Sequence, residues 1–554
     1  MRFGSVDMFI ELGDWGFRMG RLIANEGFLK ALLTYGSYGS YEFFCPDVYH
    51  MERFSKKVKD LIKDPQLLNR VKSSLQIALS EAIQLNKYDV FHLGDFTYFM
   101  PYLVDMRNRY AKDPFPITGV THSLDAIYMN LRYLELVVAG LRPYDGIICT
   151  SHSAEQTVQK GLARVTEQLS VQAGISLKAE SKLKQIPLGI DELYFIESDK
   201  SLARKYFNIP EDMIVALSVG RLSIRKKADW SPVLELLARM YASEKISKLI
   251  FLIAGGAKES EISLMESMIS KLGLEEKVLL FPNFPSDVKT RLYKAADFYI
   301  SIVDNFQETF GLNILEAMAS GLPVISSDFS GYRDLVINEK NGFLIPTIWS
   351  EELPEFIKEN LGIIDPSIAR LYLSQTVAFD LEELQRRIVA LYDNENLRTN
   401  MGLASMKRAK GYRWEKVIHS YEEFWTNLSQ EAKNSKPKDF KKQMDILLGD
   451  FEKTFSHYPS RLIDNNSVVA LTDVGRNALN GGGDFIKYED ISACLFPDLE
   501  TFILNSLSEE KHSVAFVEQQ AMDILLATKG QTRFHLLWFL KHGALKLESS
   551  PGKI

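Results

Sequence analysis

Residues 308–327 read ETFGLNILEAMASGLPVISS, and this stretch decides how the chain folds. Its first half has the apolar spacing of a short helix, and the Gly-Leu-Pro sequence at 321–323 is a typical helix stop. The apolar run that follows has the character of a strand buried on both faces. The pattern therefore predicts a loop, a helix that begins near residues 309–311 and ends at Ser320, and then a strand.

Similar apolar runs recur along the chain and alternate with amphipathic segments. This alternation, with strands that are apolar almost throughout, indicates parallel sheets covered by helices. A polar segment at 196–212 separates an early series of runs from a later one, so we expect two α/β domains. The predicted strands lie within residues 88–94, 117–123, 144–151, 213–220, 248–256, 277–283, 296–303 and 322–328.

The composition excludes several classes of protein. The 554 residues are 46% hydrophobic and 25% charged, as in globular domains. The formal net charge of -7 argues against a nucleic-acid binder. The cysteines, Cys45, Cys149 and Cys494, are odd in number and far apart, which argues against a disulfide framework and a zinc site. Because we find no signal-peptide pattern and no apolar run of about 18 residues, we expect a cytoplasmic protein, with peripheral membrane contact left open.

The last part of the chain has a different pattern. Residues 429–443 are charged and almost free of apolar residues, which predicts a linker. Short helical patterns and a glycine cluster at 480–484 then predict a separate, mostly helical domain over residues 440–554. We expect a winged-helix-like or interaction module of ordinary domain size, for which a protein or peptide is one expected partner.

The two glutamates of the opening stretch have different predicted settings. Glu308 lies in the loop and Glu316 lies within the helix. A helix N-terminus offers free N–H groups and the positive end of a dipole, and Gly311 lets a ligand approach the backbone closely. An anionic ligand at this helix end would therefore meet a carboxylate on each side. For an isolated Glu-x7-Glu pair, the commoner interpretation is that Glu308 favours the helix dipole and Glu316 is solvated.

Several motifs resemble those of retaining family-4 glycosyltransferases of the GT-B fold. The stretch that begins at Glu308 resembles the family's Glu-x7-Glu motif and the GxPV strand start that follows it. VGRLSIRKK at 219–227 resembles the family's VGRLxxxKG, with Lys227 where the family has glycine. Looser similarities are IPLGIDELYF at 186–195, DVFHLGDF at 89–96, VTHSL at 120–124 and YRWEKVIHSYEEFW at 412–425. The resemblance covers roughly residues 1–428.

The resemblance implies a domain organisation. Two Rossmann-like parallel-sheet domains would face a cleft, with residues 1–205 on the acceptor side and residues 206–411 binding the nucleotide sugar. Residues 412–428 would form a helix that crosses back onto the first domain. The domain at 440–554 lies outside the resemblance.

The resemblance also implies an activity. A sugar would move with retention of configuration from a nucleotide-diphosphate sugar, with UDP favoured over GDP, to an acceptor. The acceptor could be a glycan, a lipid or a protein or peptide. Cationic side chains and the helix end would replace a metal, so no cofactor is expected. The alternatives are a nucleotide-sugar epimerase and a catalytically inactive GT-B binding or scaffold protein. The sequence names neither the sugar, the linkage nor the oligomeric state.

The resemblance assigns roles to charged residues. Glu308 and His122 would be catalytic and face the donor sugar, although a histidine in such a place is more often a core or turn residue. Arg221 and Lys226 would neutralise the leaving diphosphate, and without the surrounding motif they would be interpreted as surface cations. Glu316 would accept hydrogen bonds from the ribose hydroxyls.

Further donor contacts are expected from the backbone and from loops. Asn283, in the turn FPNFP, would lie against the base. Gly16, together with Arg18, belongs to a first loop that would cover the diphosphate or meet the acceptor. Backbone N–H groups at the helix N-terminus would meet the sugar and the phosphates, at Phe310, Gly311, Leu312 and Asn313.

Overall fold

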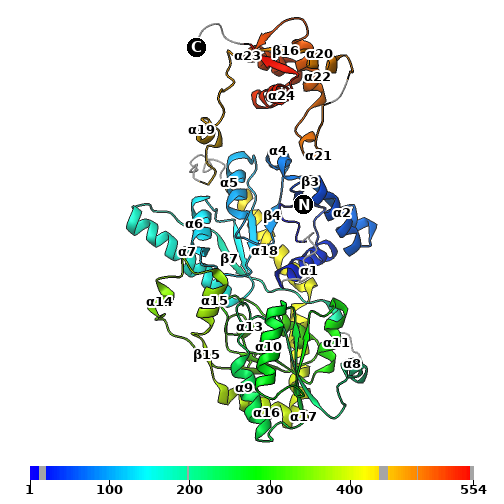
Figure 1. Ribbon diagram of the computed structural model, residues 1–554, viewed down its shortest axis with the longest axis vertical. Helices are drawn as coiled ribbons and strands as arrows, with labels where there is room; N and C mark the ends of the chain where they lie inside the picture. The colour runs from blue at the N-terminus through cyan, green and yellow to red at the C-terminus, as the bar shows by residue number, and fades with distance from the viewer. Residues whose placement is uncertain (11–19, 196–198, 436–446, 483–484, 549–554) are drawn as a thin grey trace. The chain divides into compact units, whose positions relative to one another are not determined.

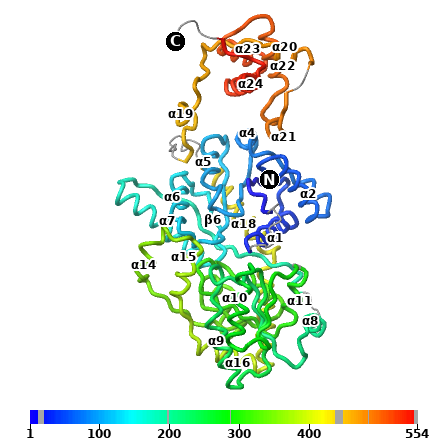
Figure 2. The backbone as a smooth tube through the Cα atoms, viewed as in Figure 1, coloured from blue at the N-terminus to red at the C-terminus, as the bar shows by residue number. Residues whose placement is uncertain are grey.

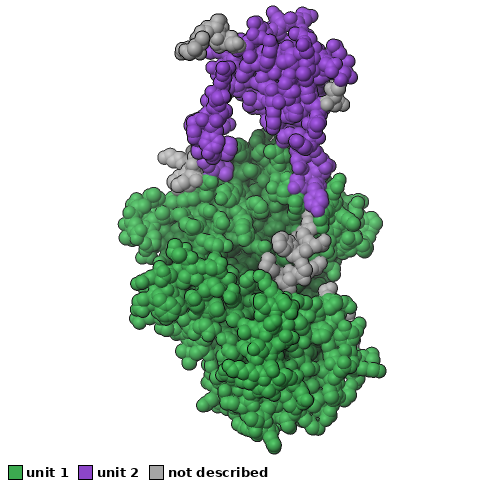
Figure 3. All heavy atoms as spheres, viewed as in Figure 1, with its two compact units in different colours: residues 1–46, 50–447 green, residues 47–49, 448–554 purple. Residues whose placement is uncertain are grey.

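The computed structural model describes residues 1–10, 20–195, 199–435, 447–482 and 485–548 (Figure 1). The chain divides into two compact units (Figure 3). Unit 1 comprises residues 1–46 and 50–447, and unit 2 comprises residues 47–49 and 448–554. Unit 1 contains two parallel sheets, and unit 2 has a small antiparallel sheet. In the described part of the chain, no helix is both long enough and apolar enough to cross a bilayer.

The first α/β domain is built on a seven-stranded parallel sheet with the order β3-β2-β1-β4-β5-β6-β7. Its central strands β4 to β6 are buried along their whole length, which explains their unbroken apolar sequences. These three are the strands that the sequence predicted in this half. The strands are β1 Arg2–Ser5, β2 Ser40–Cys45, β3 Val71–Leu75, β4 Val90–Leu93, β5 Ile117–Val120, β6 Gly146–Cys149 and β7 Lys182–Gln185.

A buried ion pair fixes one end of this sheet. Arg107 donates to Asp145 with Nη1–Oδ1 and Nη2–Oδ2 distances of 2.5 and 2.9 Å, and neither side chain is exposed. The same carboxylate accepts the N–H of Ile117 at the start of β5. Each charge of the pair has hydrogen-bonded partners, so the two charges compensate each other inside the fold.

The helices of the first α/β domain are α1 Gly20–Tyr35, α2 Val48–Leu61, α3 Pro65–Leu68, α4 Leu79–Leu85, α5 Met100–Tyr110, α6 Met129–Val138 and α7 His152–Ala173.

The second α/β domain has a six-stranded parallel sheet with the order β10-β9-β8-β11-β12-β13. All five strands that the sequence predicted in this half are present, and β13 is an addition. The strands are β8 Ile214–Val219, β9 Leu249–Gly255, β10 Val278–Pro282, β11 Phe298–Ser301, β12 Val324–Ser327 and β13 Gly342–Ile345. The helices around the sheet are α8 Lys200–Tyr206, α9 Ser231–Ala242, α10 Glu259–Lys271, α11 Lys289–Ala295, α12 Leu312–Ala319, α13 Tyr332–Leu335, α16 Leu381–Asp393 and α17 Glu395–Ala409.

An additional segment lies between β13 and α16. It contains α14 Glu355–Lys358 and α15 Pro366–Ser374. The two-residue strands β14 Thr347–Ile348 and β15 Ala378–Phe379 pair in antiparallel fashion and close this segment at its base.

The strand order creates a switch point in each sheet. In the second domain β8 lies between β9 and β11, and in the first domain β1 lies between β2 and β4. In parallel sheets, the loops that leave neighbouring strands on the two sides of such a point diverge and open a crevice at the carboxyl ends. The loops after β8 and β11 hold the sequences around Arg221 and Glu308, so this topology brings the two motifs to one edge.

Helix α8 corrects the predicted boundary between the α/β domains. The boundary was expected after residue 205, but Arg204 of α8 donates to Asp297 Oδ2 at 2.7 Å and to the carbonyl of Ala295 at 3.3 Å. Both partners lie next to β11. The helix therefore packs on the second domain, and the chain changes domain before Lys200.

Helix α18, Trp414–Asn434, returns to the first domain. Trp425 is fully buried, and its indole Nε1 donates to Thr118 Oγ1 at 3.0 Å. The helix was expected to end at residue 428, with a linker from 429. It continues to Asn434 because Ser429 and Ala432 are buried, so the charged composition of this segment belongs to the exposed helix face.

Unit 2 has its own hydrophobic core. A three-stranded antiparallel sheet has the order β17-β16-β18, with β16 Val468–Leu471, β17 His512–Ser513 and β18 Leu545–Leu547. The rest of unit 2 is mostly helical, as predicted. Residues 533–543, which are rich in aromatic side chains, lie largely in α24, and this helix buries Leu536 and Phe539. The helices are α19 Phe451–Phe455, α20 Asp473–Leu479, α21 Glu489–Ser492, α22 Pro497–Ser506, α23 Val514–Leu525 and α24 Lys529–Lys541 (Figure 2).

Because each unit has a core of its own, we expect a chain that ends at Ser435 to fold. Thermal unfolding followed by circular dichroism should show unit 1 melting within about 4 °C of its transition in the full chain. A fragment of residues 448–554 should fold separately. Aggregation of the shortened chain, or a transition far below that of the full chain, would contradict independent folding.

Candidate functional site

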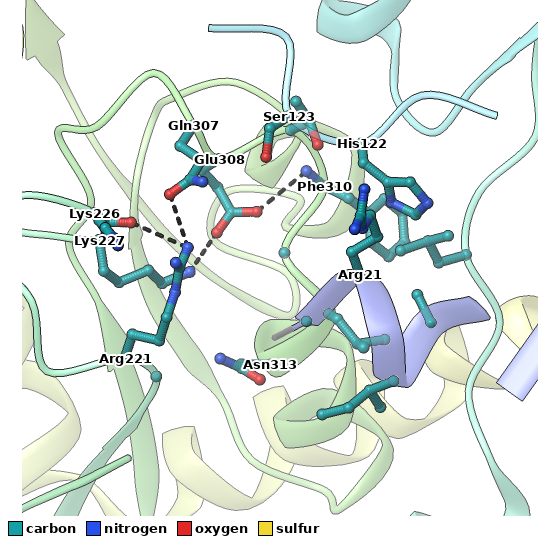
Figure 4. A pocket seen from close by; sticks show the side chains of 18 of the residues that line it. Arg21, His122, Ser123, Arg221, Lys226, Lys227, Gln307, Glu308, Phe310 and Asn313 are labelled. Atoms are coloured by element: carbon teal, nitrogen blue, oxygen red, sulfur yellow. Dashed lines mark hydrogen bonds and ion pairs between the residues drawn. The ribbon is translucent and has the colours of Figure 1, made fainter. Parts of the chain in front are cut away.

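A cavity of about 690 Å³ lies between the two α/β domains of unit 1 (Figure 4). It brings together most of the residues that the sequence predicted for a site. Glu316 is not among the lining residues, and Gly16 and Arg18 lie outside the described residues. The predicted residues that line the cavity are His122, Arg221, Lys226, Asn283, Glu308, Phe310, Gly311, Leu312 and Asn313.

The N-terminus of α12 forms part of the cavity wall. Gly311 precedes the helix with φ 105° and ψ 51°, a left-handed conformation that glycine adopts without strain. A Cβ at this position would also lie 2.7 Å from the ring of Tyr332. No side chain caps this helix end, so its N–H groups are available to a ligand. The helix begins at Leu312 and ends at Ala319, close to the predicted limits.

Glu308 is partly enclosed at the same helix end. Lys227 Nζ forms an ion pair with Glu308 Oε2, and the N–H of Phe310 donates to Oε1 at 3.3 Å. The hydroxyl of Tyr332 lies 3.4 Å from Oε2. Burial acts to raise the pKa of Glu308, but Lys227, the Phe310 N–H and Arg221 together hold this pKa below its ordinary value. The carboxylate is therefore ionised at neutral pH.

Arg221 lies beside this carboxylate on the loop after β8. Its Nη2 donates to Gln307 Oε1 at 2.8 Å and to the carbonyl oxygen of Lys226 at 3.3 Å. Burial lowers the pKa of Arg221, although the charge of Glu308 acts in the opposite sense. A guanidinium stays charged in this setting. The side chain of Lys226 makes no hydrogen bond or ion pair with any described residue, while its chain neighbour Lys227 is paired.

His122 lies on the facing side of the cavity, at the end of β5 (Figure 4). Its Nε2 lies 2.7 Å from the carbonyl oxygen of Gly94 and 3.1 Å from Asn25 Oδ1. A carbonyl oxygen only accepts, so Nε2 carries the proton and donates. Burial lowers the pKa of His122, with Asp95 acting against it. The imidazole is therefore neutral at pH 7, with a lone pair on Nδ1.

Glu316 is buried. The commoner interpretation of an isolated Glu-x7-Glu pair, in which this glutamate is solvated, is therefore wrong here. The residue is 1% exposed. Oε1 accepts from Lys289 Nζ at 2.6 Å and from Tyr194 at 3.0 Å, and Oε2 accepts from Tyr293 at 2.7 Å. A carboxylate has about four acceptor positions, so three are occupied. Lys289, which the sequence did not single out, lines the cavity at this end. The ribose contact of Glu316 stays a prediction.

Asn283 organises two loops near the cavity. It has φ 51°, and its side chain accepts the N–H of Ala257 and donates to the carbonyl of Ala257, both at 2.9 Å. This pair of bonds joins the loop after β10 to the loop after β9. The predicted base contact of Asn283 is not tested by this geometry and stays a prediction.

Several polar contacts join the two domains in the described part of the chain, at the cavity and beside it. Arg370 of α15 donates two hydrogen bonds to Asp125, from Nε to Oδ2 at 2.5 Å and from Nη2 to Oδ1 at 3.2 Å. The hydroxyl of Ser151 donates to the carbonyl of Thr309 at 2.6 Å, next to Glu308. The N–H of His152 donates to Asp334 Oδ2 at 2.7 Å. The sequence carried no signal for these pairs because their members lie far apart in the chain.

Comparison with known proteins finds similarity in the second domain. The family described as Glycosyl transferases group 1 matches residues 199–361. The D-inositol 3-phosphate glycosyltransferase of Mycobacteroides abscessus is 28% identical over 207 residues, which are 37% of this chain and 44% of the relative. D-inositol 3-phosphate glycosyltransferase 2 of Catenulispora acidiphila is 33% identical over 165 residues, 28% of this chain and 37% of the relative. The chain thus spans less than half the length of these curated relatives.

Solved structures share the architecture. Sucrose-phosphate synthase from Thermosynechococcus elongatus superposes with a TM-score of 0.50 at 18% identity, covering 78% of this chain and 99% of that chain. A glycosyltransferase from Rickettsia africae gives a TM-score of 0.50 at 13% identity, with the same coverages. At such identities the likeness concerns the fold alone. The predicted GT-B arrangement of two Rossmann-like domains is confirmed.

Replacing Glu316 should reveal how strongly it is coupled to Lys289. Glu316→Gln leaves a largely buried ammonium without its anion, and breaking such a pair costs about 3 kcal/mol. The double variant Glu316→Gln/Lys289→Met removes both charges and should melt at a higher temperature than the single variant. Differential scanning calorimetry measures both. Equal melting temperatures for the single and double variants would contradict the coupling.

The Asp125–Arg370 pair should limit domain opening. Asp125→Asn removes its charge, so we expect a longer or broader distance distribution between spin labels on the two domains. The labels would replace Ile77 and Leu403, which are 68% and 63% exposed, in a chain with Cys494→Ser. Glu135→Gln is the control, because it breaks the Arg132–Glu135 pair within one domain. Identical distributions for Asp125→Asn and Glu135→Gln would show that the cross-domain pair does not restrain opening.

Proposed function

We propose that this protein is a retaining glycosyltransferase that moves a sugar from a nucleotide-diphosphate sugar to an acceptor hydroxyl. The observation that carries the proposal is the convergence of Arg221, Lys226 and the uncapped N-terminus of α12 on one cavity wall, beside Glu308. The match to Glycosyl transferases group 1 spans these residues and supports the same conclusion.

The cationic wall suits a leaving diphosphate. When the bond between the anomeric carbon and the diphosphate breaks, its electron pair remains on the phosphate oxygen. Arg221 can bind that group with its planar fork and Lys226 with a point charge. The N–H groups of the α12 N-terminus add fixed positive charge at the same place. These groups supply the charge that a divalent cation would otherwise provide, so we propose transfer without a metal.

The sugar end of the cavity lies between Glu308 and His122. Positive charge develops at the anomeric carbon as the donor bond breaks, and an ionised carboxylate stabilises it. The neutral His122 has an accepting Nδ1 that suits a sugar hydroxyl. In the transfer, the acceptor oxygen forms the new bond to the anomeric carbon on the face that the diphosphate leaves, and its proton passes to the departing phosphate. The configuration is thereby retained.

The part of the cavity that is lined by Lys289 and Asn283 of the second domain suits a nucleoside. Lys289 lines the cavity as a donor for the ribose hydroxyls, and it binds Glu316, which lies behind the lining residues with one acceptor position unoccupied. The loops joined by Asn283 would flank the base. We propose UDP as the nucleotide, with GDP as the second candidate.

The first domain supplies the acceptor side. Arg21, paired with Asp95 at 3.3 Å, lines this wall together with Tyr98 and Tyr128, each about half exposed. Aromatic rings beside polar groups suit a glycan acceptor, and lipid or polypeptide acceptors are the other candidates. The curated relatives are named for D-inositol 3-phosphate, but the chain matches less than half of their length, so we do not assign that acceptor.

A nucleotide screen tests the proposed function. Thermal unfolding with UDP, GDP, ADP and their sugars should show stabilisation by one nucleotide, about 2.7 kcal/mol at 100 times its dissociation constant. The purified protein should also hydrolyse that nucleotide sugar slowly. Arg221→Lys should weaken binding of the nucleoside diphosphate, because a bidentate fork is replaced by a point charge. No stabilisation by any nucleotide and no hydrolysis would favour the inactive scaffold protein.

A further inference from the structure

The adjacent residues Lys226 and Lys227 have different surroundings. Both line the cavity on the loop after β8. Lys227 Nζ is paired with Glu308 Oε2 and lies 3.5 Å from the hydroxyl of Tyr332, and its side chain is 17% exposed. The backbone carbonyl of Lys226 accepts a hydrogen bond from Arg221. The ammonium of Lys226 has no ion-pair partner within the described part of the chain. One cation is therefore engaged by a carboxylate, and the other is available to a ligand.

Lys226 and Lys227 lie in one turn of the backbone. The N–H groups of Lys226 and Lys227 both donate to the carbonyl of Ser223, at 3.2 and 2.9 Å, which forms one tight turn. The stem of Lys227 crosses Gly220, where an added Cβ would lie 3.4 Å from Lys227 Cε. This is an ordinary van der Waals distance, so the stem of Lys227 passes close to Gly220 on its way to Glu308.

Few other charges face Glu308. The loop after β8 contributes Lys227 in direct contact and Arg221 at longer range, and α13 contributes Tyr332. Burial raises the pKa of Tyr332 well above its ordinary value, so this residue stays neutral, and Ser301 lies 2.9 Å from its hydroxyl. The Glu308 side chain is 14% exposed, so water contributes little. Lys227 is thus the main positive group in contact with the carboxylate.

We propose that Lys227 is a positioning residue that holds Glu308 as an oriented carboxylate at the sugar end of the cavity, while Lys226 keeps the diphosphate role of the proposed function. The role of Glu308 rests on the proposed function. The pairing itself is a property of this chain and can be measured without turnover.

The proposal predicts a shift in pH dependence. Burial of Glu308 acts to raise its pKa, and Lys227 opposes this effect. An opposite charge in contact with a carboxylate lowers its pKa, so removing Lys227 should raise the pKa of Glu308. Glu308 must be ionised to act, so kcat would then be lost at a higher pH as the solution is acidified.

Steady-state kinetics from pH 3 to pH 9, a range that includes the acid limb of the wild type, tests this in the full chain. In Lys227→Met the acid limb of kcat should move up by about one pH unit or more, and Lys227→Arg should restore it. Lys226→Met is the matched control: it should leave the acid limb in place and raise the dissociation constant of the nucleoside diphosphate about tenfold or more. An unmoved limb in Lys227→Met would overturn the proposal. Diphosphate binding weakened equally by Lys227→Met and Lys226→Met would also overturn it.

A second measurement does not depend on catalysis. In protein labelled with ¹³C-glutamate, the carboxyl signal that is absent from Glu308→Gln belongs to Glu308. It should titrate at a higher pH in Lys227→Met than in wild type, and unchanged titration would overturn the pairing. If this shift is seen in a protein that neither binds nor turns over any nucleotide sugar, the proposed function fails while the pairing stands. If Lys227→Met does not fold, Lys227→Gln provides the same comparison.

Discussion

The site depends on a constraint of parallel sheets: loops leave neighbouring strands at the same edge. In the second domain β8 lies between β9 and β11, so the loops after β8 and β11 open toward one cavity. Hydrogen bonds join these two parts: Asn313 Nδ2 in the first turn of α12 donates to the carbonyl of Val219 at 2.7 Å, and Arg221 Nη2 donates to Gln307 Oε1 at 2.8 Å. Arg221, the α12 N-terminus and Glu308 are thereby brought together.

Charge compensation is the second principle of the site. Glu308 is paired with Lys227, and Glu316 is paired with Lys289. A carboxylate this far removed from water is stable as an ion only when a cation or hydrogen-bond donors replace its hydration. The pairs leave Lys226 as a cation without a side-chain partner among the described residues, next to the helix N-terminus. The anionic part of a ligand would therefore be attracted to a specific place rather than to the whole cavity.

The fold and the site were predictable to different degrees. Central strands such as β4, β9 and β11 were predicted because burial on both faces makes their sequences almost wholly apolar. Edge strands such as β7, with the sequence KLKQ, are half-exposed and carry no such signal. The end of α18 was missed for a related reason, since charges on an exposed helix face have the same composition as a linker.

The sequence by itself determined the local units: the start of α12 directly after Gly311, the apolar strands, and the spacing of Arg221, Lys226, Glu308 and Glu316. These are short-range properties, because helix ends, strand burial patterns and loop motifs are encoded within a few residues. Only the tertiary structure decided the partners. Lys227 meets Glu308 across 81 positions of the chain, and Arg370 meets Asp125 across 245. Such pairs depend on how separate loops converge at the edges of the sheets, and residue spacing along the chain contains no record of that convergence.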